Sequence, residues 1–295
     1  MADILEENCT CPACHSQAKR LFGETREVFG QTWELARCAN CETAFTSPNP
    51  DDETLQEVYR TCFNYNWYRD HYPAKRRDAQ ERLREYGPLL GQRILDFGGG
   101  VGYFSEAARD AGYQSTTYDP FTAAAEPSPT SWDTVVALHV IEHANDLDRI
   151  CGQMKKLLAS DGRLILAVPN FAGHGYRKLG MQWVWAQPPL IHIYHFTARG
   201  LTALMQRHGF TDIQISYHER WDANTYCDVE HARWYSFLGK LWSMPLLCRW
   251  SAYRRMIATM NTNLRFRGLR RSLKNQPTNV AEFAELQITA VLPRS

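Results

Sequence analysis

The feature that most constrains the fold of this chain is a glycine-rich turn between an apolar run and a helical segment. Residues 93–97 form a short apolar run of the kind that builds a buried parallel strand. Gly98–Gly102 follows at once, and residues 103–111 have the pattern of a helix. Glycines at such a junction let the backbone approach a ligand closely, and the amino end of the helix favours a negative group. The pattern predicts an α/β fold with a nucleotide cofactor at this turn.

Two acidic residues indicate which kind of cofactor the turn binds. Asp119 ends the next predicted strand, residues 115–118, and lies 21 residues beyond Gly98. An acid at that place suits the two hydroxyls of a ribose. Asp96 comes two residues before Gly98, where a carboxylate would face the pyrophosphate of a dinucleotide. A cofactor that carries an amino-acid ammonium is compatible with that charge, so the sequence favours such a cofactor.

The pattern Asp-x-Gly-x-Gly-x-Gly with a later acid resembles motif I of the class I S-adenosylmethionine (SAM)-dependent methyltransferases. The resemblance extends to four segments that match later strands of that family: residues 132–143, 161–170, 208–215 and 285–291. It implies an α/β fold with a Rossmann-like, doubly wound, mostly parallel sheet whose last strand is antiparallel. It also implies that SAM is the cofactor and that seven residues contact it: Asp96, Gly98, Gly100, Gly102, Asp119, Leu138 and His139.

Two details of this resemblance concern single segments. Residues 195–197, together with residues 208–210, match the usual lead into the sixth strand of the family. The segment between Asp119 and Trp132 is too short for a full third strand. The residues that contact adenine are therefore not assigned.

The segment His139–His143 reads His-x-x-Glu-His and admits several interpretations. A zinc-protease motif needs a helix that places both histidines on one face, whereas this segment ends a predicted strand. In quinone O-methyltransferases a Glu-x-x-Glu-His segment here resembles a divalent-metal site, but His139 replaces the first glutamate and suits a hard cation less well. The preferred interpretation is acid–base catalysis, with His143 as base, Glu142 orienting it and His192 contacting the substrate.

Four cysteines near the start of the chain predict a structural zinc site. Cys11 and Cys14 form one Cys-x-x-Cys pair, and Cys38 and Cys41 form a second. Two such pairs complete the closed tetrahedral ligand set of structural zinc. The short hairpin predicted between them, around residues 27–35, cannot bury enough surface to fold alone, so the metal would stabilise it. The segment resembles the ribbon of bacterial zinc-ribbon methyltransferases, including sugar C-methyltransferases.

A long segment near the end of the chain is strongly basic. Residues 231–281 hold ten Lys or Arg side chains and no Asp or Glu. Five apolar residues, from Trp234 to Trp242, fall at helical spacing and form one stripe. A helical cap packed on the core explains this pattern. A peripheral contact with an anionic membrane, or with a phosphate-bearing substrate, explains it as well.

These segments predict a chain of five parts. They are a zinc ribbon (1–48), a helical connector or lid (49–87), a SAM-binding catalytic core (88–218), a basic, tryptophan-rich helical insertion (219–283) and the last core strand (284–295).

Composition narrows the classes of function. The formal net charge is +1, and the chain has neither a signal peptide nor 18 consecutive apolar residues, so we expect a cytoplasmic protein. The predicted fourth strand lacks the Asn/Asp-Pro-Pro-aromatic run of enzymes that methylate base amines, which makes nucleic acid an unlikely substrate. We therefore expect methyl transfer to a small molecule such as a sugar, a phenol or a quinone-like acceptor. The alternative is an RNA-modifying methyltransferase that uses the ribbon and the basic insertion to bind RNA.

Overall fold

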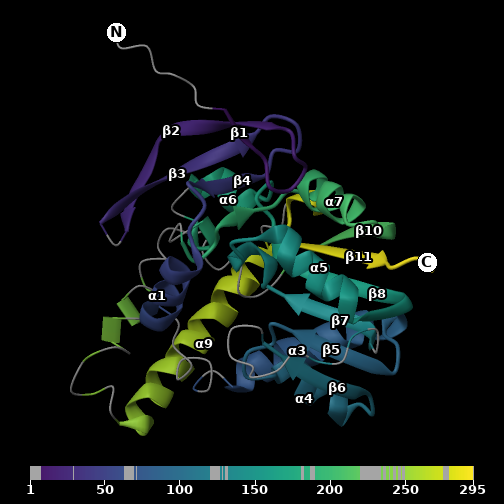
Figure 1. Cartoon of the computed structure of the whole chain (residues 1–295). Helices are drawn as coiled ribbons and strands as arrows, with labels where there is room; N and C mark the ends of the chain where they lie inside the picture. The colour runs from purple at the N-terminus through teal and green to yellow at the C-terminus, as the bar shows by residue number, and fades with distance from the viewer. Residues whose placement is uncertain are drawn as a thin grey trace.

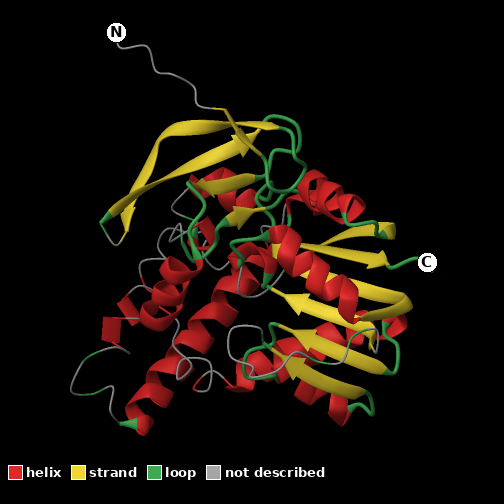
Figure 2. Cartoon of the chain, viewed as in Figure 1, coloured by secondary structure: helices red, strands yellow, loops and turns green. Residues whose placement is uncertain are grey.

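The structure, a computed structural model, contains two β-sheets with helices packed on both faces of the larger one (Figures 1 and 2). It describes residues 8–28, 30–62, 70, 72–119, 127, 129, 132–180, 183–186, 190–219, 250–274 and 279–294, and single positions between 234 and 247. Within this part of the chain, none of the helices combines the length and apolarity that a bilayer crossing needs.

The larger sheet has six strands in the order β10-β11-β8-β7-β5-β6. Its strands are β5 (Arg93–Phe97), β6 (Gln114–Tyr118), β7 (Trp132–Leu138), β8 (Leu158–Pro169), β10 (Thr211–His218) and β11 (Glu285–Val291). β5 to β8 pair in parallel, whereas β11 is antiparallel to both β8 and β10. The predicted Rossmann-like sheet with an antiparallel last strand is confirmed. β6 is the edge strand in the described part of the chain; residues 120–126 lie outside it.

Alternating side chains of the central strands belong to two hydrophobic cores, one on each face of the sheet. On one face, Leu95 and Val135 pack with α5 (Leu147–Leu157) and α7 (Ala198–Arg207). On the other face, Ile94 and Val136 pack with α3 (Tyr72–Tyr86) and α4 (Tyr103–Asp110). Successive side chains of a strand point to opposite faces, so an apolar run with no polar alternation must be covered on both sides. This makes the sheet doubly wound.

Local sequence explains where several helices begin. The side chain of Asp146 accepts from the backbone N–H of Arg149 (2.9 Å) and caps α5. Asp51 accepts from the backbone N–H of Thr54 (2.8 Å) just before α1 (Asp52–Cys62). The first turn of this helix contains Asp52 and Glu53, whose charges its amino end favours.

The smaller sheet joins the cysteine-rich segment to the core. Its order is β1-β2-β3-β4-β9, with β1 (Asn8–Thr10), β2 (Gln17–Val28), β3 (Gln31–Cys38), β4 (Ala44–Ser47) and β9 (Tyr194–His195). The predicted hairpin is present as β2 and β3, and it is longer than the spacing indicated. Strand β9 comes from the core, about 150 residues after β4 in sequence, and pairs Ala44 with His195 and Phe45 with Tyr194.

Residues 195–197 lead through α7 into β10, as the sequence predicted, and the structure adds a second role for the start of this segment. Tyr194–His195 is a strand of the smaller sheet, and Thr197 caps α7 by accepting from the backbone N–H of Gly200 (3.2 Å). The turn expected at Asp161–Gly162 is an irregularity within β8, where the register against β7 shifts between Trp132 and Thr134. Both segments are set by pairing with distant strands, which local sequence does not reveal.

The basic insertion contains a long helix, α9 (Ser251–Lys274). Ile257 and Ala258 are buried, and Arg254 pairs with Asp70 of the connector (3.1 Å). Several large apolar side chains of this segment are exposed, including Trp234, Phe237 and Trp250. Trp242, the last residue of the predicted apolar stripe, lies outside the described residues. Among the described members of the stripe, Leu238 is buried.

Candidate active site

The glycine turn lies at the carboxyl end of β5, and its glycines have different roles. Gly98, Gly100 and Gly102 all have positive φ angles, of 70°, 54° and 83°. A Cβ atom on Gly98 would lie 2.5 Å from Val140, and one on Gly102 would lie 2.6 Å from the hydroxyl of Thr117. A Cβ atom on Gly100 would meet no atom of the described residues within 4 Å. Gly100 is thus the glycine whose open side can receive a ligand.

Asp96 lies beneath the turn and does not face outward. Its side chain is 2% exposed, and it accepts from the backbone N–H (3.2 Å) and the hydroxyl (3.3 Å) of Ser105 in α4. A Cβ atom on Gly99 would lie 2.3 Å from its carboxylate. Burial raises the pKa of Asp96 to about 7. In the structure this carboxylate holds the turn against α4, and its contact with a cofactor ammonium stays a prediction.

The other predicted cofactor residues lie along the same edge of the sheet. Asp119 follows β6, and the backbone N–H of Gly98 donates to the carbonyl of Tyr118 beside it (2.6 Å). Leu138 ends β7 and is partly buried. Ligands of open α/β sheets bind at the carboxyl ends of the strands. The open side of Gly100 and the carboxylate of Asp119 therefore fit a nucleoside cofactor at this edge.

His139 follows Leu138 and is held between two carboxylates. Its Nδ1 donates to Glu142 Oε1 and its Nε2 donates to Glu285 Oε2, each at 3.1 Å. Burial opposes protonation, but the hydrogen bonds to the two glutamates outweigh it and raise the pKa of His139 to about 9. Arg82 binds Glu285 through two nitrogens, at 3.0 and 2.5 Å. Both ring nitrogens of His139 are thus used within the protein, and neither is free for a cofactor.

The predicted catalytic residues come together in the structure. Glu142 and His143 lie in a 3₁₀ turn, η2 (Ile141–His143), and His192 lies in the loop before β9. One ligand atom of each residue lies within 4.8 Å of the others. The rings of His143 and His192 meet edge to face, with centroids 4.7 Å apart. Burial lowers the pKa of both histidines, so they are neutral near pH 7.

Three further residues contribute to this region, and the sequence analysis did not identify them. Trp185 stacks on both His139 and His192, with centroids 5.5 Å away in each case. Arg82 and Glu285 are buried and anchor His139. The signal that could have revealed Glu285 is its charge at the start of a strand whose other residues are apolar or uncharged. Arg82 lies in a highly charged helix and has no such signal.

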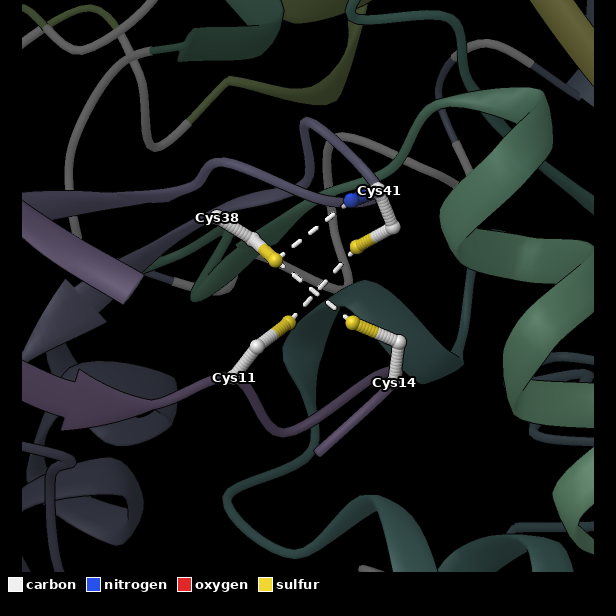
Figure 3. Close-up of side chains that lie close together, drawn as sticks. All are labelled: Cys11, Cys14, Cys38 and Cys41. Atoms are coloured by element: carbon white, nitrogen blue, oxygen red, sulfur yellow. Dashed lines mark hydrogen bonds between the residues drawn. The ribbon is translucent and has the colours of Figure 1, made fainter. Parts of the chain in front are cut away.

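The four predicted zinc ligands converge on one point between the two Cys-x-x-Cys turns (Figure 3). The sulfur atoms of Cys11 and Cys41 are 3.7 Å apart, and those of Cys14 and Cys38 are 3.5 Å apart. A disulfide would require about 2.05 Å. Tetrahedral zinc with Zn–S bonds of about 2.3 Å separates its sulfurs by about 3.8 Å. The backbone N–H of Cys41 also points at the sulfur of Cys38 (3.4 Å). The sulfur geometry therefore fits a tetrahedral metal ion.

The cysteine cluster is attached to the loop that carries His192. The hydroxyl of Thr197 donates to the carbonyl of Cys41 (2.6 Å), and the backbone N–H of Thr46 donates to the carbonyl of Ile193 (2.9 Å). The backbone N–H of Ile193 donates in turn to the carbonyl of Glu142 (2.7 Å). The loop is therefore held between the ribbon on one side and η2 on the other.

Known proteins provide an independent comparison. The sequence profile of a family described as methyltransferase domain matches residues 68–215, half of the chain. Phosphoethanolamine N-methyltransferase 2 of Haemonchus contortus superposes with a TM-score of 0.51 at 16% identity, covering 95% of this chain and 70% of that one. A SAM-dependent methyltransferase from Archaeoglobus fulgidus superposes with a TM-score of 0.42 at 18% identity, covering 82% of this chain and 100% of that one. No curated protein sequence matches.

The doubly wound sheet, with a glycine turn and an acid at its carboxyl edge, defines a Rossmann-like protein of the methyltransferase fold. The chain belongs to the methyltransferase domain family and is an enzyme. The resemblance on which the sequence analysis relied is thereby confirmed for the family and the fold.

Proposed function

We propose that this enzyme binds SAM at the turn Gly98–Gly102 and transfers its methyl group to a small-molecule acceptor. The observation that carries the proposal is the open side of Gly100 at the sheet edge where Asp119 follows the neighbouring strand β6, with the histidine cluster beginning after β7 on the other side of β5. Bound SAM supplies a methyl group activated by a sulfonium. Asp119 suits the ribose hydroxyls, and the backbone at Gly100 lets the cofactor approach closely.

The cluster of Glu142, His143 and His192 supports a role in activating the acceptor. His143 Nδ1 donates to the carbonyl of Ile191 (2.5 Å), which leaves Nε2 as the basic atom of a neutral ring. Nε2 is the atom that we assign to accept the proton of the acceptor. A base in this position typically contributes ~10²–10⁴-fold to the rate. Glu142 bonds protonated His139 through Oε1, so its charge is balanced while it lies in the same cluster as His143 and His192.

The ribbon supports a structural role for zinc. All four sulfurs come from the protein and fill a tetrahedral set, so the ion would have no open position for a substrate. Zinc there would hold the segment that pairs with β9. The enclosed setting of His192, which is 3% exposed, favours a small acceptor over RNA.

Calorimetric titration with SAM tests the cofactor assignment. Asp119→Ala should weaken SAM binding by about 1.5–3 kcal/mol, the range for a hydrogen bond to a charged group. Asp133→Ala is the control, because Asp133 bonds Arg93 and precedes the strand end at Leu138 by five residues. Binding of NAD without binding of SAM would overturn the proposal.

His143→Ala tests the assignment of the proton acceptor. Turnover with phenol and sugar acceptors should fall at least ~10²-fold, while the affinity for SAM changes little. Methylation of RNA but of none of these small acceptors would replace the small-molecule assignment with the RNA alternative.

A further inference from the structure

The cluster beside η2 contains acceptor atoms that the fold orients but does not satisfy. His143 donates from Nδ1 to the carbonyl of Ile191 (2.5 Å), and His192 donates from Nδ1 to the carbonyl of Trp185 (2.6 Å). Each backbone carbonyl can only accept, so each fixes the proton on Nδ1 and leaves a lone pair on Nε2. The structure shows no hydrogen bond to either Nε2 atom among its described residues.

Glu142 adds a third acceptor to the two histidines. Its side chain is fully buried, and its Oε1 atom is engaged by His139. Its Oε2 atom is buried and has no hydrogen-bond partner in the part of the chain that the structure describes. A buried carboxylate oxygen without a donor is unfavourable unless a proton donor or a cation meets it.

We propose that Glu142, His143 and His192 bind a divalent transition-metal ion of the zinc class. Two imidazoles and one carboxylate form a ligand set of open zinc sites, and ligating histidines usually donate their other N–H to a carbonyl or carboxylate. Both histidines of the cluster do so. One possible ligand atom of each residue lies within 4.8 Å of the others, so side-chain shifts on the order of 1 Å would bring the three residues around one ion.

His139 is excluded from this ligand set, although it lies in the same motif. Both of its nitrogens are bound to carboxylates, and it stacks on Trp185. His139 instead donates a hydrogen bond to Oε1 of the proposed ligand Glu142 and thereby fixes the orientation of that carboxylate. His192, 49 residues after His143, takes the third position. The site therefore differs from a metal site formed by the contiguous His-x-x-Glu-His segment.

The proposed site has a different character from the ribbon. The cysteine cluster is closed by four protein ligands, whereas this site supplies three and leaves a position open. The acceptor of the proposed methyl transfer can complete the coordination, and a bound cation lowers the pKa of a hydroxyl that it coordinates. The two roles of His143 are alternatives, because its Nε2 atom has one lone pair. In the metal-free cluster Nε2 is the proton acceptor assigned above, and with the ion bound it is a ligand while the ion activates the hydroxyl.

Metal analysis of the intact protein tests the site. Protein produced with zinc and dialysed without chelator should contain about two zinc ions per chain, and His192→Ala should contain about one. Glu142→Gln keeps the shape of the side chain and should also fall to about one ion. His208→Asn is the control. His208 follows the carboxyl end of α7 and bonds Asp148 of α5, so this substitution should not change the number of zinc ions per chain.

Cobalt substitution identifies the ligands of each ion. The ribbon should show thiolate-to-cobalt charge-transfer bands, and the second ion should show bands of a nitrogen–oxygen site that disappear in His192→Ala. One ion per chain with thiolate bands alone overturns the proposal, and so does a second ion that both variants retain. SAM binding and methyl transfer by a one-ion protein would leave the proposed function standing without this site. Two ions in a protein that transfers no methyl group would leave the metal site standing without the proposed function.

Discussion

Gly100 shows how one residue can report on ligand binding. Gly100→Ala adds a methyl group on the side that is open in the structure, so it should weaken SAM binding at least about 10-fold, or about 1.4 kcal/mol. Gly112→Ala is a matched control, because Gly112 also has a positive φ and open space but lies in the turn after α4. Both variants should lose similar stability from backbone strain. Equal SAM affinity in the two variants would contradict the cofactor site.

Asp96 makes the stability of the enzyme depend on pH. Burial raises its pKa to about 7, against about 3.9 when unfolded. The folded state therefore holds the proton more tightly, and this contribution is present below the unfolded pKa and is lost as the pH rises through about 7. Relative to Asp96→Asn, the wild-type free energy of unfolding should fall by about 2 kcal/mol between about pH 5 and pH 8. Urea unfolding at both pH values measures it; no change relative to Asp96→Asn would show that the carboxyl is ionised throughout this range.

The pairing of β4 with β9 couples two parts of the molecule that are far apart in sequence. Cys41→Ser should remove the ribbon metal and release the loop that carries His192. Because a misplacement of about 1 Å can cost ~10²-fold in rate, turnover should drop at least ~10-fold. SAM affinity should stay unchanged, because none of the backbone hydrogen bonds of the described residues joins the glycine turn to the ribbon.

Cys9→Ser is the matched control for this element. Cys9 lies in β1 next to the cluster but is not one of its four sulfurs. It should keep both the metal and full turnover. Parallel loss of SAM binding in Cys41→Ser would mean that the ribbon stabilises the whole fold and not the acceptor loop.

Across the whole molecule, positive charge gathers in the segment that also exposes aromatic rings. Trp250 is 69% exposed and Trp234 is 53% exposed, within the 51-residue stretch that has ten basic and no acidic residues. Indole rings favour the membrane interface, and arginines favour anionic headgroups. We predict that the enzyme co-sediments with anionic vesicles and not with neutral ones, and that salt releases it.

Substitutions separate this membrane contact from a substrate contact. Trp250→Ala and Arg255→Glu should reduce co-sedimentation, while Arg84→Glu on α3, another exposed arginine, should reduce it far less. If no vesicles bind and Arg255→Glu raises the KM of a phosphate-bearing acceptor, the segment contacts the substrate instead.

Much of the fold follows from the sequence because its signals are local. The run at β5, the turn Gly98–Gly102 and the acid at Asp119 predicted the sheet edge at which we place the cofactor. The two Cys-x-x-Cys pairs predicted that the four cysteines would meet, because each such turn directs two sulfurs toward one point. The spacing of a few neighbouring residues is sufficient to predict such features.

Only the tertiary structure decided how the chemical groups of the site are paired. Arg82 and Glu285 are 203 residues apart, yet they form an ion pair, and Glu285 engages Nε2 of His139 while Glu142 engages its Nδ1. The strand β9 brings His192 to Glu142 and His143, and the packing of Gly99 turns Asp96 inward. The physical reason is that these roles depend on burial and on hydrogen bonds between distant segments. Such contacts exist only once the sheet has formed and leave no periodicity in the sequence.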